Sequence, residues 1–250
     1  MKQTIIGIFC ILSFNLKAQK ITYTLVALCD NIYQGIVPVP SSIGNGDSPK
    51  TNLYWGCGYG VRTYFIKSKD WVLIKKSKVD SIILERCVFF NKNNNTYHIA
   101  DAYRGKHIKK CTEDFFMAAA GKLNRNIIVN DSLKINTIKA KLINYVGHDG
   151  LMDFNLKTYP KGDENNDRKT TILACYSKSY YEKGIKLAKA TPYIWTTHLM
   201  APEAYTLHDI INCWMKGKSG KEADEAAAQA YNKYQKCGIR GARNLFTTGF

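Results

Sequence analysis

Two apolar stretches of the sequence each end at a side chain that can take part in nucleophilic chemistry. Residues 142–147 precede His148, and residues 170–174 precede Cys175. A cysteine thiol attacks a carbonyl carbon once its proton is removed, and a neighbouring imidazole can carry that proton. The pair would therefore suit cleavage of an acyl bond. In the alternative interpretation, Cys175 is a core cysteine and His148 is a polar group that is satisfied within the fold.

The same two stretches predict the elements that would bring these side chains together. Both have the length and the apolar or β-branched content of inner strands in a parallel sheet. Twenty-seven positions separate His148 from Cys175, which leaves room for the crossover that two parallel neighbours need. Ligand crevices in such sheets lie outside the carboxyl ends of the strands. We therefore expect His148 and Cys175 at one edge of the sheet, within reach of each other.

A helix is expected shortly after Cys175. Ser179 and Glu182 have the spacing of a capping box, which marks the beginning of a helix. The positive end of that helix would face the sulfur and favour the thiolate, which is the form that attacks. On this basis Cys175 should be the first cysteine to react with an alkylating reagent at about pH 6.

The two strand ends carry a resemblance to a known family. An apolar strand that ends in His with a glycine nearby, followed after a spacer by an apolar strand that ends in Ala-Cys, resembles the caspase, legumain, gingipain and clostripain group of cysteine peptidases. Residues 172–179, with the sequence ILACYSKS, are particularly similar to the segment around the legumain nucleophile. The resemblance in motif covers about residues 140–182.

This resemblance implies a role for each residue of the motif. Cys175 would be the nucleophile, His148 the general acid and base, and the main-chain N–H groups of Asp149, Gly150 and Cys175 would form the oxyanion hole. The family usually has glycine directly after the histidine, whereas this chain has Asp149 and then Gly150. A carboxylate would therefore lie near the developing oxyanion.

Three further residues are candidates for binding a substrate. Asp30 follows an expected strand over residues 21–29, although it would equally suit a simple turn or cap. Arg62 suits planar pairing with a carboxylate. His198 follows an expected strand over residues 193–197 and is a rival general base. Together with Asp149 and Asp153, Asp30 would favour a basic substrate side chain and Arg62 an acidic one, and the sequence leaves this choice open.

The remaining pattern predicts a three-layer α/β fold with a mostly parallel central sheet flanked by helices, compatible with a caspase-like fold. Residues 81–90 and 97–102 are expected to form a hairpin, and a loop is expected over residues 34–52. Helices are expected over residues 112–121, from about residue 202, and from a capping box at Ser219 and Glu222. Residues 19–250 have the length of a single domain.

The chain begins with a segment that has the form of a secretory signal peptide. Residues 5–14 form an apolar run that is too short to span a bilayer, and Ala18 suits a signal-peptidase site. We expect cleavage after Ala18, a mature chain that begins at Gln19, and a secreted or periplasmic location. No later stretch is long and apolar enough for a transmembrane helix.

Charge and cysteine content limit the remaining classes of function. The formal charge is +16, and removing Lys2 and Lys17 leaves +14. Most of the excess is lysine spread along the chain, whereas nucleic-acid binding would favour clustered arginine and lysine among exposed aromatic residues. Seven cysteines remain after Cys10, so at least one stays unpaired unless it bonds another molecule, and the absence of a Cys-x-x-Cys pair argues against a zinc ribbon.

The sequence therefore favours a secreted cysteine endopeptidase whose substrate is a peptide or protein. Cys175 would attack the peptide carbonyl, His148 would protonate the leaving amine, and an acyl-enzyme would then be hydrolysed. This chemistry requires no metal and no organic cofactor. Two alternatives stay open: an inactive protein of the same fold that binds a peptide or cell-surface partner, and a basic polyanion-binding protein. No feature indicates the oligomeric state.

Overall fold

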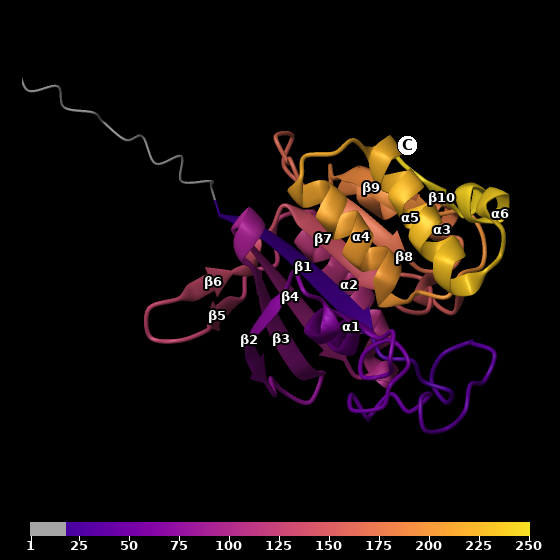
Figure 1. Cartoon of the computed structure of the whole chain (residues 1–250), viewed down its shortest axis with the longest axis horizontal. Coiled ribbons are helices and arrows are strands. Elements are labelled where there is room, and N and C mark those ends of the chain that lie inside the picture. The colour runs from indigo at the N-terminus through magenta and orange to yellow at the C-terminus, as the bar shows by residue number, and fades with distance from the viewer. Residues whose placement is uncertain (1–18) are drawn as a thin grey trace, which may run out of the picture.

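An eight-stranded sheet forms the centre of the protein, and the computed structural model describes residues 19–250 (Figure 1). The strand order is β10-β9-β8-β7-β1-β4-β3-β2, in which the five strands from β9 to β4 are parallel and the edges are antiparallel. A separate hairpin joins β5 to β6. The strands are β1 (Lys20–Ala27), β2 (Val72–Ser77), β3 (Ile83–Asn91), β4 (Thr96–Tyr103), β5 (Asn126–Ile128), β6 (Lys134–Asn136), β7 (Leu142–Val146), β8 (Lys169–Leu173), β9 (Thr191–Thr196) and β10 (Phe246–Thr247).

Helices cover both faces of the sheet. Buried residues of α2 and α3 pack in one core cluster, and those of α1, α4, α5 and α6 pack in the other. This arrangement confirms the predicted α/β class with a large, mostly parallel central sheet. The helices are α1 (Val61–Lys67), α2 (Ile108–Ala119), α3 (Ser177–Leu187), α4 (Ala204–Met215), α5 (Gly220–Gln235) and α6 (Ile239–Leu245), with short 3₁₀ turns η1 (Lys92–Asn94), η2 (Gly105–His107), η3 (Thr137–Lys139) and η4 (Gly150–Met152).

The inner strands have the composition that burial on two faces requires. Every residue of β7 is buried, as are seven of the eight residues of β1 and four of the five residues of β8. The predicted hairpin is confirmed, since β3 and β4 pair antiparallel across a short 3₁₀ turn. The capping box at Ser219 and Glu222 is also confirmed at the beginning of α5.

The helix expected shortly after Cys175 is confirmed as α3, but its predicted capping residues and the predicted beginning of α2 are wrong. The capping box expected at Ser179 and Glu182 does not form, because α3 begins at Ser177 and Glu182 instead pairs with Lys186 at 2.7 Å. The N-cap of α3 is Tyr176, which has a left-handed backbone with a φ of 48°. Helix α2 begins at Ile108 rather than at Thr112, whose hydroxyl donates to the carbonyl of Ile108 within the helix.

The predicted loop after β1 is confirmed, and it extends over residues 28–60 without a helix or strand. In Figure 1 this segment lies at the lower right, beyond the arrowhead of β1. The fully buried amide of Asn52 holds it by bonding the N–H and carbonyl of Cys29 and the carbonyl of Asn45. Irregular backbone can therefore stay ordered beside the carboxyl ends of the strands.

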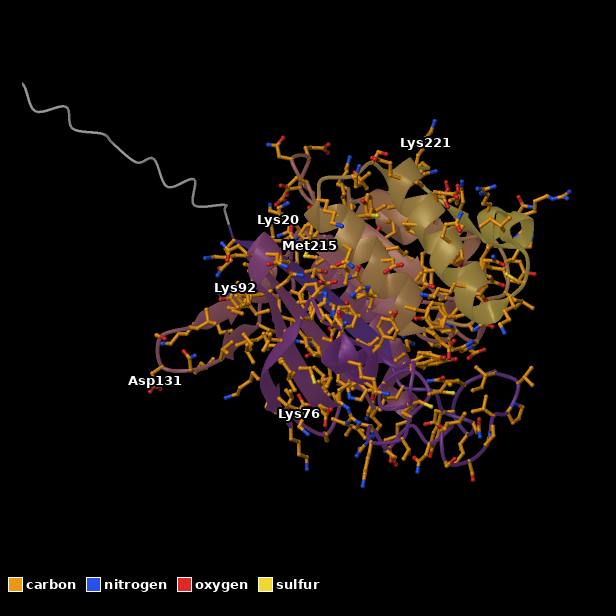
Figure 2. All side chains as sticks on the ribbon, viewed as in Figure 1. Lys20, Lys76, Lys92, Asp131, Met215 and Lys221 are labelled. Carbon is orange, nitrogen blue, oxygen red and sulfur yellow. The ribbon has the colours of Figure 1, made fainter. Side chains whose placement is uncertain are left out.

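The surface and the termini bear on three further expectations. The signal peptide expected over residues 1–18 lies outside the described residues. Within residues 19–250, no helix has the length and apolar character needed to cross a membrane. The seven cysteines of this part are all free thiols. Lysines are dispersed, as Figure 2 illustrates with Lys20 on β1, Lys76 on β2, Lys92 in η1 and Lys221 on α5.

Candidate active site

His148 and Cys175 occupy equivalent positions on two neighbouring parallel strands. Val146 of β7 is paired with Leu173 of β8, and each reactive residue follows its strand by two positions. Both residues line one cavity of about 290 Å³ at the carboxyl edge of the sheet. The prediction that the two strands are parallel neighbours is therefore confirmed.

Gly147 turns the chain between β7 and His148. Its φ is +148°, and a Cβ atom at this position would lie 2.8 Å from the carbonyl oxygen of Ala27 on β1. A side chain is therefore excluded both by the backbone conformation and by the close approach of the neighbouring strand. The N–H of Gly147 donates to Leu173 at 3.2 Å and continues the pairing with β8. This glycine places His148 at the edge of the sheet.

A carboxylate that the sequence reasoning did not assign to this role orients the imidazole. Nε2 of His148 lies 2.8 Å from Oδ2 of Asp153, which also accepts a hydrogen bond from the N–H of Gly35 at 2.9 Å. A carboxylate accepts, so Nε2 carries the proton and Nδ1 is left as the basic nitrogen. The hydroxyl of Tyr145 donates to the carbonyl of His148 at 2.8 Å. In the sequence, this role could have been suspected from a carboxylate that follows the histidine by five positions.

Cys175 is bonded to the main chain of a neighbouring loop. Its Sγ accepts from the N–H of Met200 at 3.4 Å and lies 3.7 Å from the carbonyl oxygen of Met200. Within residues 19–250, no hydrogen bond joins this sulfur to His148. Burial raises the pKa of the Cys175 thiol, and the Asp149 carboxylate adds to this, while the N–H of Met200 acts in the opposite direction. Burial thus opposes the expected thiolate, and stabilisation of this thiolate by the helix end stays a prediction.

Two of the three main-chain N–H groups expected to form an oxyanion hole are unpaired, although their residues do not line the cavity beside Cys175. The N–H groups of Asp149 and Gly150 donate no hydrogen bond within the described part of the chain. The Asp149 side chain is fully buried and caps η4, because its Oδ1 accepts from the N–H of Leu151 at 3.0 Å. Its Oδ2 has no partner among residues 19–250, and burial raises the pKa of this carboxyl to about 7. The carboxylate that replaces the usual glycine is thus directed into the protein.

The three residues expected to bind substrate do not line the cavity beside Cys175. Asp30 accepts from the N–H groups of Ile32 and Tyr33 and organises the turn after β1. Arg62 on α1 forms an ion pair with Glu85 at 3.1 Å. His198 bonds the hydroxyl of Thr197 and lines a neighbouring cavity of about 360 Å³. The structure therefore brings His148, and not His198, to the cavity of Cys175.

The walls of the Cys175 cavity come mainly from three segments, of which the loop after β1 was expected from the sequence to rim the substrate cleft. One is the loop after β1, one follows β9, and one is η4 with the residues before it. Because most side chains of these walls are apolar, their residue types alone did not mark them as part of a reactive site. The cavity is lined by Gly35, Ile36, Val37, Tyr54, Gly147, His148, Met152, Cys175, Leu199, Met200 and Pro202.

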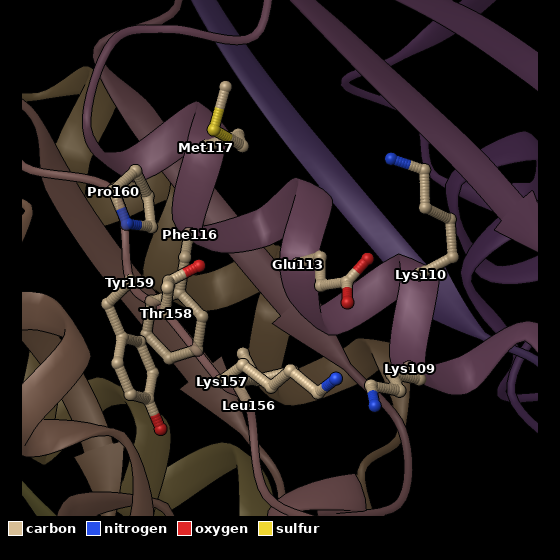
Figure 3. Close-up of a pocket in the computed structure, with 10 residues that line it drawn as sticks. All are labelled: Lys109, Lys110, Glu113, Phe116, Met117, Leu156, Lys157, Thr158, Tyr159 and Pro160. Carbon is tan, nitrogen blue, oxygen red and sulfur yellow. The ribbon is translucent and has the colours of Figure 1, made fainter.

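A larger hollow of about 570 Å³ lies elsewhere, along α2 (Figure 3). Its walls carry Lys109, Lys110 and Glu113 from α2 and Lys157 from the facing segment. No cysteine or histidine lines it. Within residues 19–250, no group of three or more His, Cys, Asp or Glu side chains is arranged to hold a metal ion. The cavity of Cys175 is therefore the better candidate for covalent chemistry, although it is the smaller one.

Comparison with known proteins gives no family for this chain. No family model, no curated protein and no solved structure matches it. The function is therefore argued from the geometry at the carboxyl edge of the sheet.

Proposed function

We propose that this protein is a cysteine peptidase that hydrolyses peptide bonds through an acyl-enzyme on Cys175. The observation that carries the proposal is the meeting of Cys175 and the Asp153-oriented His148 at one cavity, with two unpaired main-chain N–H groups directly after His148 in the chain. A nucleophile, a base with an orienting group and donors for an oxyanion are the parts that acyl transfer requires. The resemblance of residues 172–179 to the legumain segment supports the same chemistry and a caspase-like fold.

In this mechanism the entering substrate displaces the main chain of Met200 from the sulfur. Nδ1 of His148 takes the thiol proton as Sγ attacks the peptide carbonyl, and the N–H groups of Asp149 and Gly150 donate to the oxyanion. The C–N bond then breaks, and His148 gives its proton to the leaving amine. Water, deprotonated by His148, hydrolyses the thioester, which releases a carboxylate and restores the thiol. Asp153 keeps the proton on Nε2 throughout.

Export is part of the proposal. The apolar run over residues 5–14 and Ala18 support a cleaved signal peptide and a secreted or periplasmic enzyme whose substrate is a peptide or protein. The intact mass of the exported protein tests this directly. A chain that begins at Gln19 is expected, and a chain that retains residues 1–18 would contradict it.

The test of catalysis is cleavage of a mixed peptide library, followed by mass spectrometry of the products. We expect cleavage by the native protein and a loss of at least about 10³-fold for Cys175→Ala, because the nucleophile forms the covalent bond. Cys213→Ala is the matched control, since Cys213 is also a half-buried thiol but lies on α4 away from the cavity. Cleavage that survives Cys175→Ala, or no cleavage by the native protein, would reject the proposal.

A second function is favoured by the state of the thiol. The bonds from Cys175 to Met200, and the raised pKa of this thiol, suit an inactive protein that uses the same cavity to bind a peptide. This alternative predicts that peptides bind equally well to the native protein and to Cys175→Ala, and that neither releases products.

A further inference from the structure

The residues around Cys175 leave no free charge to select a substrate side chain. Asp153 is occupied by His148 and the N–H of Gly35, and it does not line the cavity. Asp149 is fully buried and does not line the cavity. The candidates Asp30 and Arg62 are held by local main-chain groups and by Glu85, respectively. A charged side chain that entered this cavity would lose hydration and gain no counter-charge.

The cavity wall is instead apolar, and this character continues to its rim. Ile36, Tyr54 and Pro202 line the interior together with Met200. Three of the lining side chains are also strongly exposed, with Val37 at 88%, Leu199 at 66% and Met152 at 42%. Contiguous exposed apolar side chains mark sites that bind a ligand or partner. Here they surround a thiol and an imidazole, which identifies the ligand as one that presents apolar surface next to a reactive carbonyl.

The size of the cavity limits what can enter it. Pockets for drug-sized ligands occupy roughly 300–1,000 Å³, and this cavity of about 290 Å³ lies just below that range. It therefore suits one amino-acid side chain with the adjoining backbone. Because Cys175 and His148 line the same space, the side chain that fills it belongs to the residue whose carbonyl is attacked.

We propose that Ile36, Val37, Leu199 and Met200 select an apolar side chain, of about the size of leucine or methionine, at the position directly before the scissile bond. This inference rests on the proposed peptidase function. It assigns the two loops, over residues 35–37 and 199–202, as the specificity-determining walls. It also rejects both charged preferences that the sequence left open.

The inference is tested with fluorogenic peptides that differ only in the residue before the cleaved bond, namely leucine, methionine, arginine or aspartate. We expect kcat/KM to be roughly 100-fold higher for leucine and methionine than for arginine and aspartate, since neither charge finds a partner in the cavity. Leu199→Glu should then raise the ratio of arginine to leucine cleavage about tenfold, because it adds a carboxylate and removes apolar surface.

Ile128→Glu on β5 is the matched control, because Ile128 is also an exposed apolar residue, at 59%, and does not line the cavity. It should leave the preference unchanged. A preference for arginine or aspartate that is lost in Cys175→Ala would overturn the specificity inference and leave the peptidase function standing. If the native protein cleaves none of the peptides, the peptidase function fails, and binding of the same peptides to Cys175→Ala decides the specificity. Stronger binding of the leucine peptide supports the apolar selection, and equal or absent binding rejects it.

Discussion

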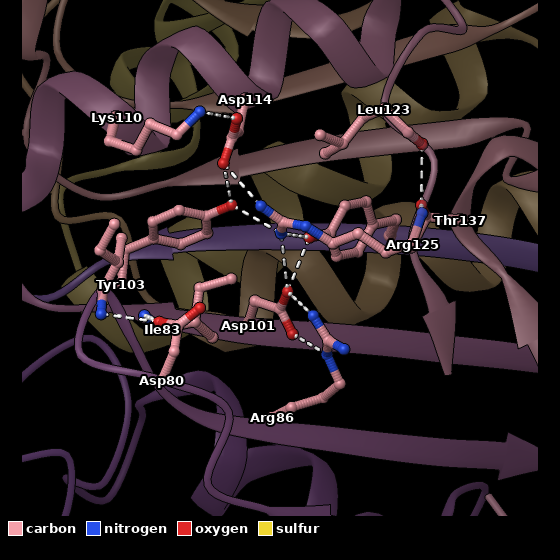
Figure 4. A network of polar contacts seen from close by, with 12 residues as sticks. Asp80, Ile83, Arg86, Asp101, Tyr103, Lys110, Asp114, Leu123, Arg125 and Thr137 are labelled. Atoms are coloured by element: carbon pink, nitrogen blue, oxygen red, sulfur yellow. Dashed lines mark hydrogen bonds and ion pairs between the residues drawn. The ribbon is translucent and has the colours of Figure 1, made fainter. Parts of the chain in front are cut away.

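Two regions of this protein bury ionisable side chains, and they differ in how completely those side chains are paired. The first is a network on the α2 face of the sheet, centred on Asp101 and Asp114 (Figure 4). The second is the site at the carboxyl edge, with His148, Asp149 and Cys175. The sheet positions both regions. In the second, His148 and Cys175 themselves line a cavity, whereas the first meets the hollow along α2 through Lys110, and its carboxylates Asp101 and Asp114 are buried.

In the network every carboxylate oxygen has a partner. The fully buried Asp101 accepts from Arg86 through Nε at 2.5 Å and Nη2 at 2.6 Å, from Arg125 at 3.1 Å and from the Tyr23 hydroxyl at 2.7 Å. Asp114 accepts from Arg125, from the Tyr103 hydroxyl and from Lys110. Burial alone would lower the pKa of Arg125. The surrounding phenols and carboxylates raise it by more, so the pKa lies above its ordinary value. Such a saturated network fixes α2 and the segment before β5 to the sheet.

At the carboxyl edge several groups remain unpaired. Oδ2 of Asp149 and the N–H groups after His148 have no partner within residues 19–250. An unpaired group is not by itself a site, as His98 illustrates: both of its ring nitrogens also lack partners, and burial among aromatic residues lowers its pKa to about 3. The difference lies in the neighbours, because His98 is enclosed among aromatic side chains, whereas the unpaired groups after His148 directly follow a residue that lines a cavity. Polar groups without hydrogen-bond partners near an accessible nucleophile therefore point to a functional site. Polar groups that are all paired, as in the network, point to a role in stabilising the fold.

The largest predicted effect tests the structural half of this comparison. Asp101→Asn should lower the free energy of unfolding by about 3–5 kcal/mol, since it leaves the buried guanidinium group of Arg86 without its charged partner and leaves Arg125 with Asp114 alone. Asp167→Asn is the control, because Asp167 forms an exposed pair with Lys141 and should change stability by less than about 1 kcal/mol. Urea unfolding at pH 7 measures both variants. If both variants lost the same free energy of unfolding, the network would contribute no more to stability than an exposed ion pair.

A smaller effect is predicted for the unpaired carboxyl of the site. Burial raises the pKa of Asp149 from its usual value near 3.8 to about 7 in the folded protein. The folded state therefore binds the proton more tightly than the unfolded state, and the stability present below pH 3.8 is lost as the pH rises through 7. Asp149→Asn keeps the acceptor for Leu151 without the charge. Relative to this variant, the free energy of unfolding of the native protein should fall by about 2–3 kcal/mol between pH 5 and pH 8.

The measurement for Asp149 is urea unfolding of both proteins at pH 5, 6, 7 and 8. Asp163→Asn serves as control, since Asp163 lies in the exposed loop over residues 161–167. A difference between native protein and Asp149→Asn that does not vary with pH would mean that Asp149 is charged or neutral throughout this range, and the unpaired oxygen would then have a partner in solution.

Sequence patterns were sufficient for the parts of the fold that depend on local periodicity. The apolar runs before His148 and Cys175 predicted inner parallel strands, and the hairpin and the Ser219 cap followed from turn and capping chemistry. A helix shortly after Cys175 was predicted as well, but the residues that cap α3 were not. Ser177 bonds Ile172 and Thr196, which are brought beside it only by the pairing of β8 and β9, and these contacts replace the local cap at Ser179.

The site was predictable only in its two reactive residues. Their positions follow from strand ends, which local sequence reveals, whereas their partners come from segments distant along the chain. Met200 reaches Cys175 across 25 positions, and Gly35 reaches Asp153 across 118. The sequence also could not indicate that Arg62 is neutralised by Glu85. Charge near a motif in sequence is thus a poor guide to charge in the cavity, which depends on tertiary pairing.

The smallest predicted effect concerns the order in which thiols react, and it sharpens the comparison between accessible and enclosed groups. Because burial raises the pKa of Cys175 and Met200 occupies its sulfur, iodoacetamide at pH 7 should modify the exposed Cys237 a few times faster than Cys175. A peptidyl chloromethyl ketone that ends in leucine should reverse this order, since its side chain fills the cavity and displaces the main chain of Met200. Peptide mapping after limiting labelling measures both ratios.

If iodoacetamide reacts first at Cys175, the thiolate is already stabilised without a substrate, and His148 must then contact the sulfur directly in solution. If the ketone also prefers Cys237, the cavity does not orient a peptide on Cys175, and the binding alternative loses its support together with the peptidase.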